Sequence, residues 1–165
     1  MTRFVLIAIT LILLSGCGFR PLYGNTTTLA GGTTALDQVM IEDIPGGVSG
    51  LNLKNALIDR FYNNGYPDSP PYALTLQLHE SGRSIIIQKN DTTTRTQLVL
   101  NASYKLINRQ TREVIDEGRI RSVSAFNNLP SQYTTMVTQA DARDMAVREL
   151  ADKITLRMAV VLEKR

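Results

Sequence analysis

Cysteine, histidine and tryptophan are scarce in this chain of 165 residues, which has one cysteine, one histidine and no tryptophan. A single cysteine, Cys17, excludes an internal disulfide and any metal site built from several cysteines, so stability has to come from packing. The lone histidine, His79, stands beside Glu80 on the polar side of an expected strand and is interpreted as a solvated surface group. Because catalysis needs a nucleophile, an acid–base pair or a metal set, the sequence predicts no enzyme, no metal and no cofactor.

Long apolar runs are also lacking. The apolar run from Phe4 to Leu14 is too short to span a bilayer as a helix. It follows the basic residue Arg3 and precedes the small residues Ser15 and Gly16, which is the order found in a secretory signal. Since no later apolar run has membrane length, we expect a chain that is anchored to a membrane without crossing it.

The sequence Leu14-Ser15-Gly16-Cys17 resembles the lipobox of bacterial lipoproteins. The resemblance implies that the Cys17 thiol takes a diacylglycerol, that the chain is cut before this residue, and that the new amine is acylated. An ordinary secretory signal followed by a free thiol is the alternative. We expect a signal peptide over residues 1–16, a lipidated N-terminus and flexible Thr- and Gly-rich tether over 17–35, and a single α+β domain over 36–165.

Net charge excludes one class of partner. The chain has 18 basic and 15 acidic side chains, a formal net charge of +3. Loss of the signal peptide removes only Arg3 from this balance, so the net charge falls by one. Such a small surplus does not indicate nucleic-acid binding. Any basic surface must therefore come from local clustering of lysine and arginine.

Periodicity predicts the secondary structure of the domain. Apolar and polar side chains alternate most clearly over 92–107, which predicts a strand with one buried face. Helical spacing predicts a helix over 51–64 with Ser49 as its N-cap, and another from Ser131 almost to the C-terminus, with Met136 and Ala140 on its apolar side. Further strands are expected at 38–44, at 72–79 and 84–89 with a bulge or break near Gly82, and at 113–126 with a kink or bulge at Gly118.

This order of elements predicts an α+β fold, in which two helices pack on one face of a mostly antiparallel four-stranded sheet. The other face then meets water or a partner. Basic residues recur along the expected strands, namely Arg83, Lys89, Arg95, Lys105, Arg119 and Arg121. They contact an anionic ligand through charge-assisted hydrogen bonds, or they protect strand edges against aggregation, and the residues alone leave both interpretations open.

Acidic residues are interpreted mainly as solvated surface. Asp116 and Glu117 are adjacent, as a pair of catalytic carboxylates would be, but they lie near an expected turn where charges usually serve solubility. Asp141, Asp144, Glu149 and Asp152 alternate with arginines along the last helix, where pairing three or four residues apart explains them without a ligand. The loop 46–50 is interpreted as a plain turn, with anion binding as the alternative.

Three stretches of the sequence together resemble a known family. They are Cys17 to Gly24, Phe126-Asn127-Asn128, and Asp144 to Leu150. With one early helix, long strands and a final helix, they are similar to the LptE family of lipopolysaccharide-assembly lipoproteins. The resemblance implies a lipid-anchored protein on the periplasmic side of the cell outer membrane. It also implies that the protein plugs and supports an LptD-type β-barrel and assists the delivery of lipopolysaccharide to the outer leaflet.

The same resemblance suggests lipopolysaccharide-binding residues. Family members use one basic residue before the central strand turn and another in the last helix, and the matching positions are Lys89 and Arg148. A long charged C-terminal extension seen in some relatives is absent from this sequence. A second function class stays open, that of a free-standing envelope lipoprotein which binds another amphiphile or envelope protein.

Overall fold

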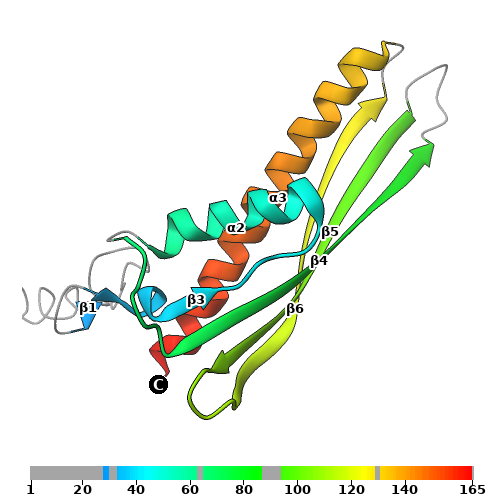
Figure 1. The fold of residues 1–165 in the computed structure, drawn as a ribbon. Coiled ribbons are helices and arrows are strands. Elements are labelled where there is room, and N and C mark those ends of the chain that lie inside the picture. Colours follow the sequence, from blue (N-terminus) through cyan, green and yellow to red (C-terminus); the bar gives the residue numbers. More distant parts are fainter. Residues whose placement is uncertain (1–27, 30–32, 63–64, 87–93, 129–130, 165) are drawn as a thin grey trace, which may run out of the picture.

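The computed structural model describes residues 28–29, 33–62, 65–86, 94–128 and 131–164. Two very short strands, β1 and β2, pair with each other, and a 3₁₀ helix, η1, follows them. The remaining elements form a sheet with two helices on it (Figure 1). In chain order the elements are β1 (Thr28–Leu29), β2 (Thr33–Thr34), η1 (Ala35–Gln38), β3 (Val39–Ile41), α2 (Gly47–Phe61), β4 (Tyr72–Ile86), β5 (Thr94–Asn108), β6 (Val114–Asn128) and α3 (Gln132–Glu163).

The main sheet has the strand order β3-β4-β5-β6. Its long strands β4, β5 and β6 are antiparallel, whereas the short β3 runs parallel to β4 because the chain crosses over through α2 between them. Both helices lie on the same side of the sheet (Figure 1). The predicted α+β class, with two helices on one face of a mostly antiparallel four-stranded sheet, is confirmed.

Two expected irregularities in the strands are wrong. β4 runs unbroken past Gly82, which pairs regularly with Leu98 of β5. The register shift between β5 and β6 lies where Leu106 pairs with Asp116 and Ile107 with Val114, so it does not lie at Gly118. Glycine at 118 serves a different purpose, because a Cβ there would be 3.0 Å from the hydroxyl of the Tyr104 side chain packed over it.

Helix α2 begins earlier than the sequence predicts. It starts at Gly47, and its N-cap is Gly46, which has a φ of 134° that favours glycine. Ser49 is therefore inside the helix and does not cap it; its hydroxyl donates a hydrogen bond to Glu80 of β4 instead. The loop interpreted as a plain turn in fact contributes the first turn of α2.

The hydrophobic core lies between the sheet and the helices. The inward side chains of β5 alternate as predicted, with Leu98, Leu100, Ala102, Tyr104 and Leu106 all buried. On α3 burial begins only at Ala142, so the placement of Met136 and Ala140 on the core side is wrong. The reason is visible in Figure 1, where the first turns of α3 extend past the end of α2.

Candidate functional site

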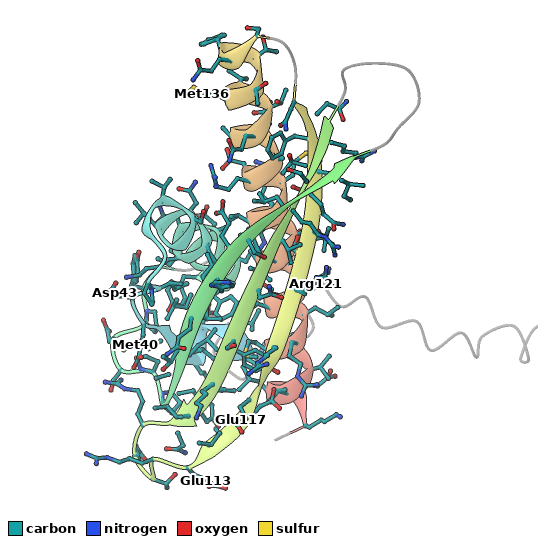
Figure 2. All side chains as sticks on the ribbon, turned by 90° about the vertical axis from the view of Figure 1, so that its right-hand side faces the viewer. Met40, Asp43, Glu113, Glu117, Arg121 and Met136 are labelled. Atoms are coloured by element: carbon teal, nitrogen blue, oxygen red, sulfur yellow. The ribbon has the colours of Figure 1, made fainter. Side chains whose placement is uncertain are left out.

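The sheet face turned away from the helices is the candidate site, here called the open face. Inward side chains of β6 are identified by their bonds to α3, since Ser122 donates to Glu149 and Ser124 donates to the carbonyl of Ala142. Because successive side chains of a strand point to opposite faces, the odd-numbered residues of this part of β6 point away from α3. Figure 2 views the molecule from this side, with Arg121 and Glu117 on β6. The three long strands present the following titratable side chains on the open face: His79, Arg83, Arg95, Lys105, Glu117, Arg119 and Arg121.

Strand register brings the polar side chains of the open face into rows. Arg121 pairs with Asn101 of β5, and Asn101 pairs with His79 of β4. The neighbouring row contains Arg119, two residues from Arg121 along β6, so the two guanidinium groups start from positions about 6.6 Å apart. Both arginines are exposed. The sheet therefore presents two adjacent cations beside other hydrogen-bonding side chains.

Positive charge on the open face is almost unopposed. One carboxylate of the face, Glu117, lies 3.4 Å from the Lys105 ammonium, and another, Glu42, accepts a hydrogen bond at 2.8 Å from the open-face hydroxyl of Thr75. Among the residues that the structure describes, no carboxylate pairs with the four arginines of the face, Arg83, Arg95, Arg119 and Arg121. Arginine forms two parallel hydrogen bonds with phosphate or carboxylate, so the face is suited to an anionic ligand.

A three-element junction fixes α3 to the back of β4. Arg143 of α3 donates to both carboxylate oxygens of Glu80 at 2.7 to 3.0 Å, and Ser49 of α2 donates to the same carboxylate at 2.9 Å. The Arg143 guanidinium holds the pKa of Glu80 below its ordinary value, against the opposing effect of burial. The carboxylate is therefore charged at neutral pH and joins two helices to one strand.

A second junction fixes the C-terminal half of α3 to β5 and β6. Arg157 donates to both oxygens of Asp116 at 2.7 and 2.9 Å, and to the Tyr104 hydroxyl at 3.0 Å. Tyr104 in turn donates to Asp116 at 2.8 Å. Arg157 lowers the pKa of Asp116, while burial and then the Asp116 carboxylate raise the pKa of Tyr104. These contacts hold β6, the strand that carries both Arg119 and Arg121.

Asp116 and Glu117 do not form a pair of catalytic carboxylates. Their side chains point to opposite faces of β6, because Asp116 meets Arg157 behind the sheet and Glu117 meets Lys105 on the open face. His79 is exposed, as predicted. Within the described ranges no cluster of histidine, cysteine, aspartate and glutamate is arranged to hold a metal. No described helix is both long and apolar enough to cross a membrane.

The residues suggested for lipid and lipopolysaccharide binding are only partly visible. Cys17 and Lys89 lie outside the described residues. Arg148 is exposed on α3, four residues from Asp144 and four from Asp152, whose carboxylates bond to Asn52 and Arg60 of α2. Residues four apart share a side of a helix, so Arg148 lies on the side toward α2. The sheet separates it from the open face.

Acidic residues of α3 make more specific contacts than the sequence suggests. Pairing along the helix is found for Glu149 with Lys153 at 2.7 Å. Asp144 and Asp152 instead bond across to α2, which spacing along one helix cannot predict. Arg143 and Arg157 were likewise not distinguished from surface arginines. The one available signal was that Glu80 and Asp116 occupy inward positions of their strands, where a charge requires a partner.

Comparison with solved structures finds this fold in several lipoproteins. A candidate lipoprotein from Caulobacter crescentus CB15 is 20% identical, with a TM-score of 0.62 over 79% of this chain and 93% of that chain. A minor lipoprotein from Acinetobacter baumannii is 16% identical, with a TM-score of 0.56 over 74% and 91% of the two chains. The rare lipoprotein B from Shewanella oneidensis is 13% identical, with a TM-score of 0.56 over 76% and 95%. Identities this low show the shared fold alone.

Sequence comparison identifies the family. No curated protein matches the chain significantly. The model of the LptE family, described as lipopolysaccharide-assembly, matches residues 36–158. This range includes the whole four-stranded sheet, α2, and α3 except for its last turn. That match extends over most of the chain. The chain therefore belongs to the LptE family, whose members are non-enzymatic lipoproteins of lipopolysaccharide assembly.

Proposed function

We propose that this chain is an outer-membrane lipoprotein, anchored on the periplasmic side through lipid on Cys17. In this proposal it plugs and supports an LptD-type barrel and assists the delivery of lipopolysaccharide to the outer leaflet. The observation that supports ligand binding most directly is that the open-face arginines have no described carboxylate partner, on a chain of the lipopolysaccharide-assembly family. The ligand is an anionic amphiphile, so its phosphates are the groups that such a face would bind.

Arg119 and Arg121 are the best-placed residues for this contact. They are exposed, they are adjacent on one strand, and no described carboxylate competes for them. The strand that carries them is fixed from behind by the bond between Asp116 and Arg157. A phosphate binding here would meet preorganised guanidinium groups. Lys89 and Arg148 are kept as further contacts suggested by family resemblance, with Arg148 reached from the helical side.

Charge reversal tests this arrangement. Arg119→Glu combined with Arg121→Glu should weaken lipopolysaccharide binding about five- to a hundredfold, equivalent to about 1 to 3 kcal/mol, because attraction at the phosphate becomes repulsion. Lys89→Glu and Arg148→Glu should each weaken binding by a smaller factor. Binding is measured by fluorescence titration at two salt concentrations, with the thermal midpoint Tm of each variant recorded in parallel.

Lys164→Glu, an exposed charge reversal at the far end of α3, is the control. Binding that is equal in all variants, or a loss that only follows a fall in Tm, would contradict ligand contact at the open face. A loss with Arg148→Glu alone would move the contact to the helical side.

The barrel is tested separately. The full-length chain is expressed with its signal in a bacterial envelope and extracted in mild detergent, and a large β-barrel protein should co-purify with it. The Cys17→Ala variant should leave the membrane fraction and lose the acyl mass. If the wild-type chain is acylated but purifies with no barrel, the protein is a free-standing envelope lipoprotein, and plugging is wrong.

A further inference from the structure

The sheet ends on both sides in an edge that another strand could join. At the β3 edge this is prevented by Tyr62, whose hydroxyl donates to the carbonyl of Val39 at 2.8 Å and accepts from the amide of Ile41 at 3.1 Å. One side chain thus occupies both backbone groups that a neighbouring strand would use. At the other end β6 is the last strand, fifteen residues long, and no strand from the described part of the chain pairs with its outer edge. Exposed edges of this length are templates for pairing.

Two side chains of α3 close the middle of the β6 edge. Lys153 donates from its ammonium to the carbonyl of Arg121 at 2.9 Å. Glu149 accepts a hydrogen bond at 2.5 Å from the hydroxyl of Ser122, and the nearby backbone amide of Val123 helps to lower the pKa of its carboxylate. Glu149 and Lys153 also pair with each other at 2.7 Å. We call these two residues the clasp.

The clasp uses the same backbone groups as a fifth strand would. In a strand, the amide and carbonyl of one residue point to the same side, and those of the next residue to the other. The carbonyl of Arg121 and the amide of Val123 both point away from β5; Lys153 occupies the carbonyl, and the Glu149 carboxylate lies near the amide. A neighbouring strand would need these two groups at the centre of the edge. A neighbouring strand cannot make its hydrogen bonds at this point while the clasp is in place.

We propose that the β6 edge is a latent strand-pairing surface that the clasp holds closed, and that a second copy of this chain, antiparallel through its own β6, occupies it when the clasp is removed. Every copy carries the same edge, so a two-fold axis perpendicular to the sheet can relate them. With Arg119 on that axis, Glu117 of each copy lies opposite Arg121 of the other. Two opposite-charge pairs favour this register, against the one like-charge pair that the two Arg119 side chains form on the axis.

The clasp is a rigid device. Its residues are one helical turn apart on α3, and buried Leu150 and Ile154 follow each of them in the sequence, so packing sets the position of both. The hydrogen bonds from Lys153 and Ser122 lower the pKa of Glu149, which keeps the carboxylate charged at neutral pH. The edge is therefore closed in the folded monomer without any partner.

The test removes the clasp from the full mature chain in detergent solution, without barrel or lipopolysaccharide, so its result is independent of the proposed function. Sedimentation velocity should show a monomer for the wild type and a dimer for Glu149→Ala combined with Lys153→Ala. Hydrogen exchange should then slow at the amides of Arg119 and Arg121 in the dimer. Lys153→Met, which keeps the length of the stem, should dimerise more weakly and guards against a misfolded double variant.

Two further variants make the outcome decisive. Asp144→Ala with Arg148→Ala removes an equally spaced pair of charges from the other side of α3 and should stay monomeric. Adding Arg119→Pro to the clasp-free variant removes an amide that faces the free edge and should abolish the dimer while β5 stays paired. A monomeric clasp-free variant with fast exchange at Arg121, or a dimer that survives the proline, overturns the proposal.

Discussion

Single atoms decide how β5, β6 and α3 fit together. Tyr104 is a buried side chain whose hydroxyl lies between Asp116 and Arg157, so its position determines whether that ion pair keeps its geometry. Gly118 lies directly opposite Tyr104 in the register and gives the ring its space. The junction between Asp116, Tyr104 and Arg157 therefore depends on the absence of a Cβ at position 118 as well as on the two charges.

Gly118→Ala should lower stability. The added Cβ would lie 3.0 Å from the Tyr104 hydroxyl and 3.2 Å from two ring atoms, so the ring has to move and pull the hydroxyl from its partners. We expect a loss of about 1 to 3 kcal/mol, reduced slightly by the better strand propensity of alanine. The measurement is the free energy of unfolding in urea.

Gly82→Ala is the matched control, because that Cβ would meet only a methyl group of Thr96 at 3.9 Å. Its stability should stay near the wild-type value or rise. An equal loss for both variants would mean that strand position, and not the Tyr104 ring, explains the effect.

At the scale of elements, α3 is attached to the sheet by charged side chains at three successive places. Arg143 bonds to β4, the clasp bonds to β6, and Arg157 bonds to β6 again through Asp116. All three attachments use a carboxylate with a lowered pKa. The helix therefore depends on ionised carboxylates as well as on its apolar face.

Acid should loosen α3 in a defined pH range. Glu80 and Asp116 have lower pKa values in the folded chain than the ordinary values of 4.5 and 3.8. The unfolded chain then binds more protons, so their contribution is complete above these values and is lost as pH falls through the folded pKa values. Tm should therefore begin to fall as the pH drops below about 4.5, the ordinary pKa of the Glu80 carboxyl.

Glu80→Gln combined with Asp116→Asn should show a lower Tm at pH 7 and a shallower fall of Tm toward pH 3, measured by circular dichroism. Glu163→Gln, at the exposed C-terminal end of α3, is the control and should follow the wild type. A double variant with the same pH slope as the wild type would show that other groups control acid unfolding.

Sequence patterns predicted elements better than the contacts between them. The alternation of β5 and the helical spacing after Ser131 reflect burial repeated at each position, so both elements were predicted nearly to the residue. Ser49 illustrates what a pattern misses, since its hydroxyl met Glu80, thirty-one positions away in the chain, and not the adjacent helix end. The sequence pattern identifies the cations of the open face. It does not show that Arg148 lies apart from them, because this depends on how α2 crosses α3.

At the scale of the whole molecule, the two faces of the sheet have separate tasks. One face buries the core, and almost every charge on its strands is paired with a helix. The open face keeps arginines without described carboxylate partners. Because the folding contacts lie on one side, residues of the open face can change with little cost to stability.

The overhang of α3 gives the molecule a mechanical property. Residues 132–141 bury no side chain, and the exposed Tyr133 and Met136 lie near the helix tip, ahead of the first ion pair at Arg143 (Figures 1 and 2). From Tyr133 to Arg143 the helix rises about 15 Å. This segment is a cantilever, and a sideways force at its tip acts on the rest of the molecule as torque. The first bonds to the sheet that feel this torque are the one from Ser124 to the carbonyl of Ala142 and the ion pair between Arg143 and Glu80.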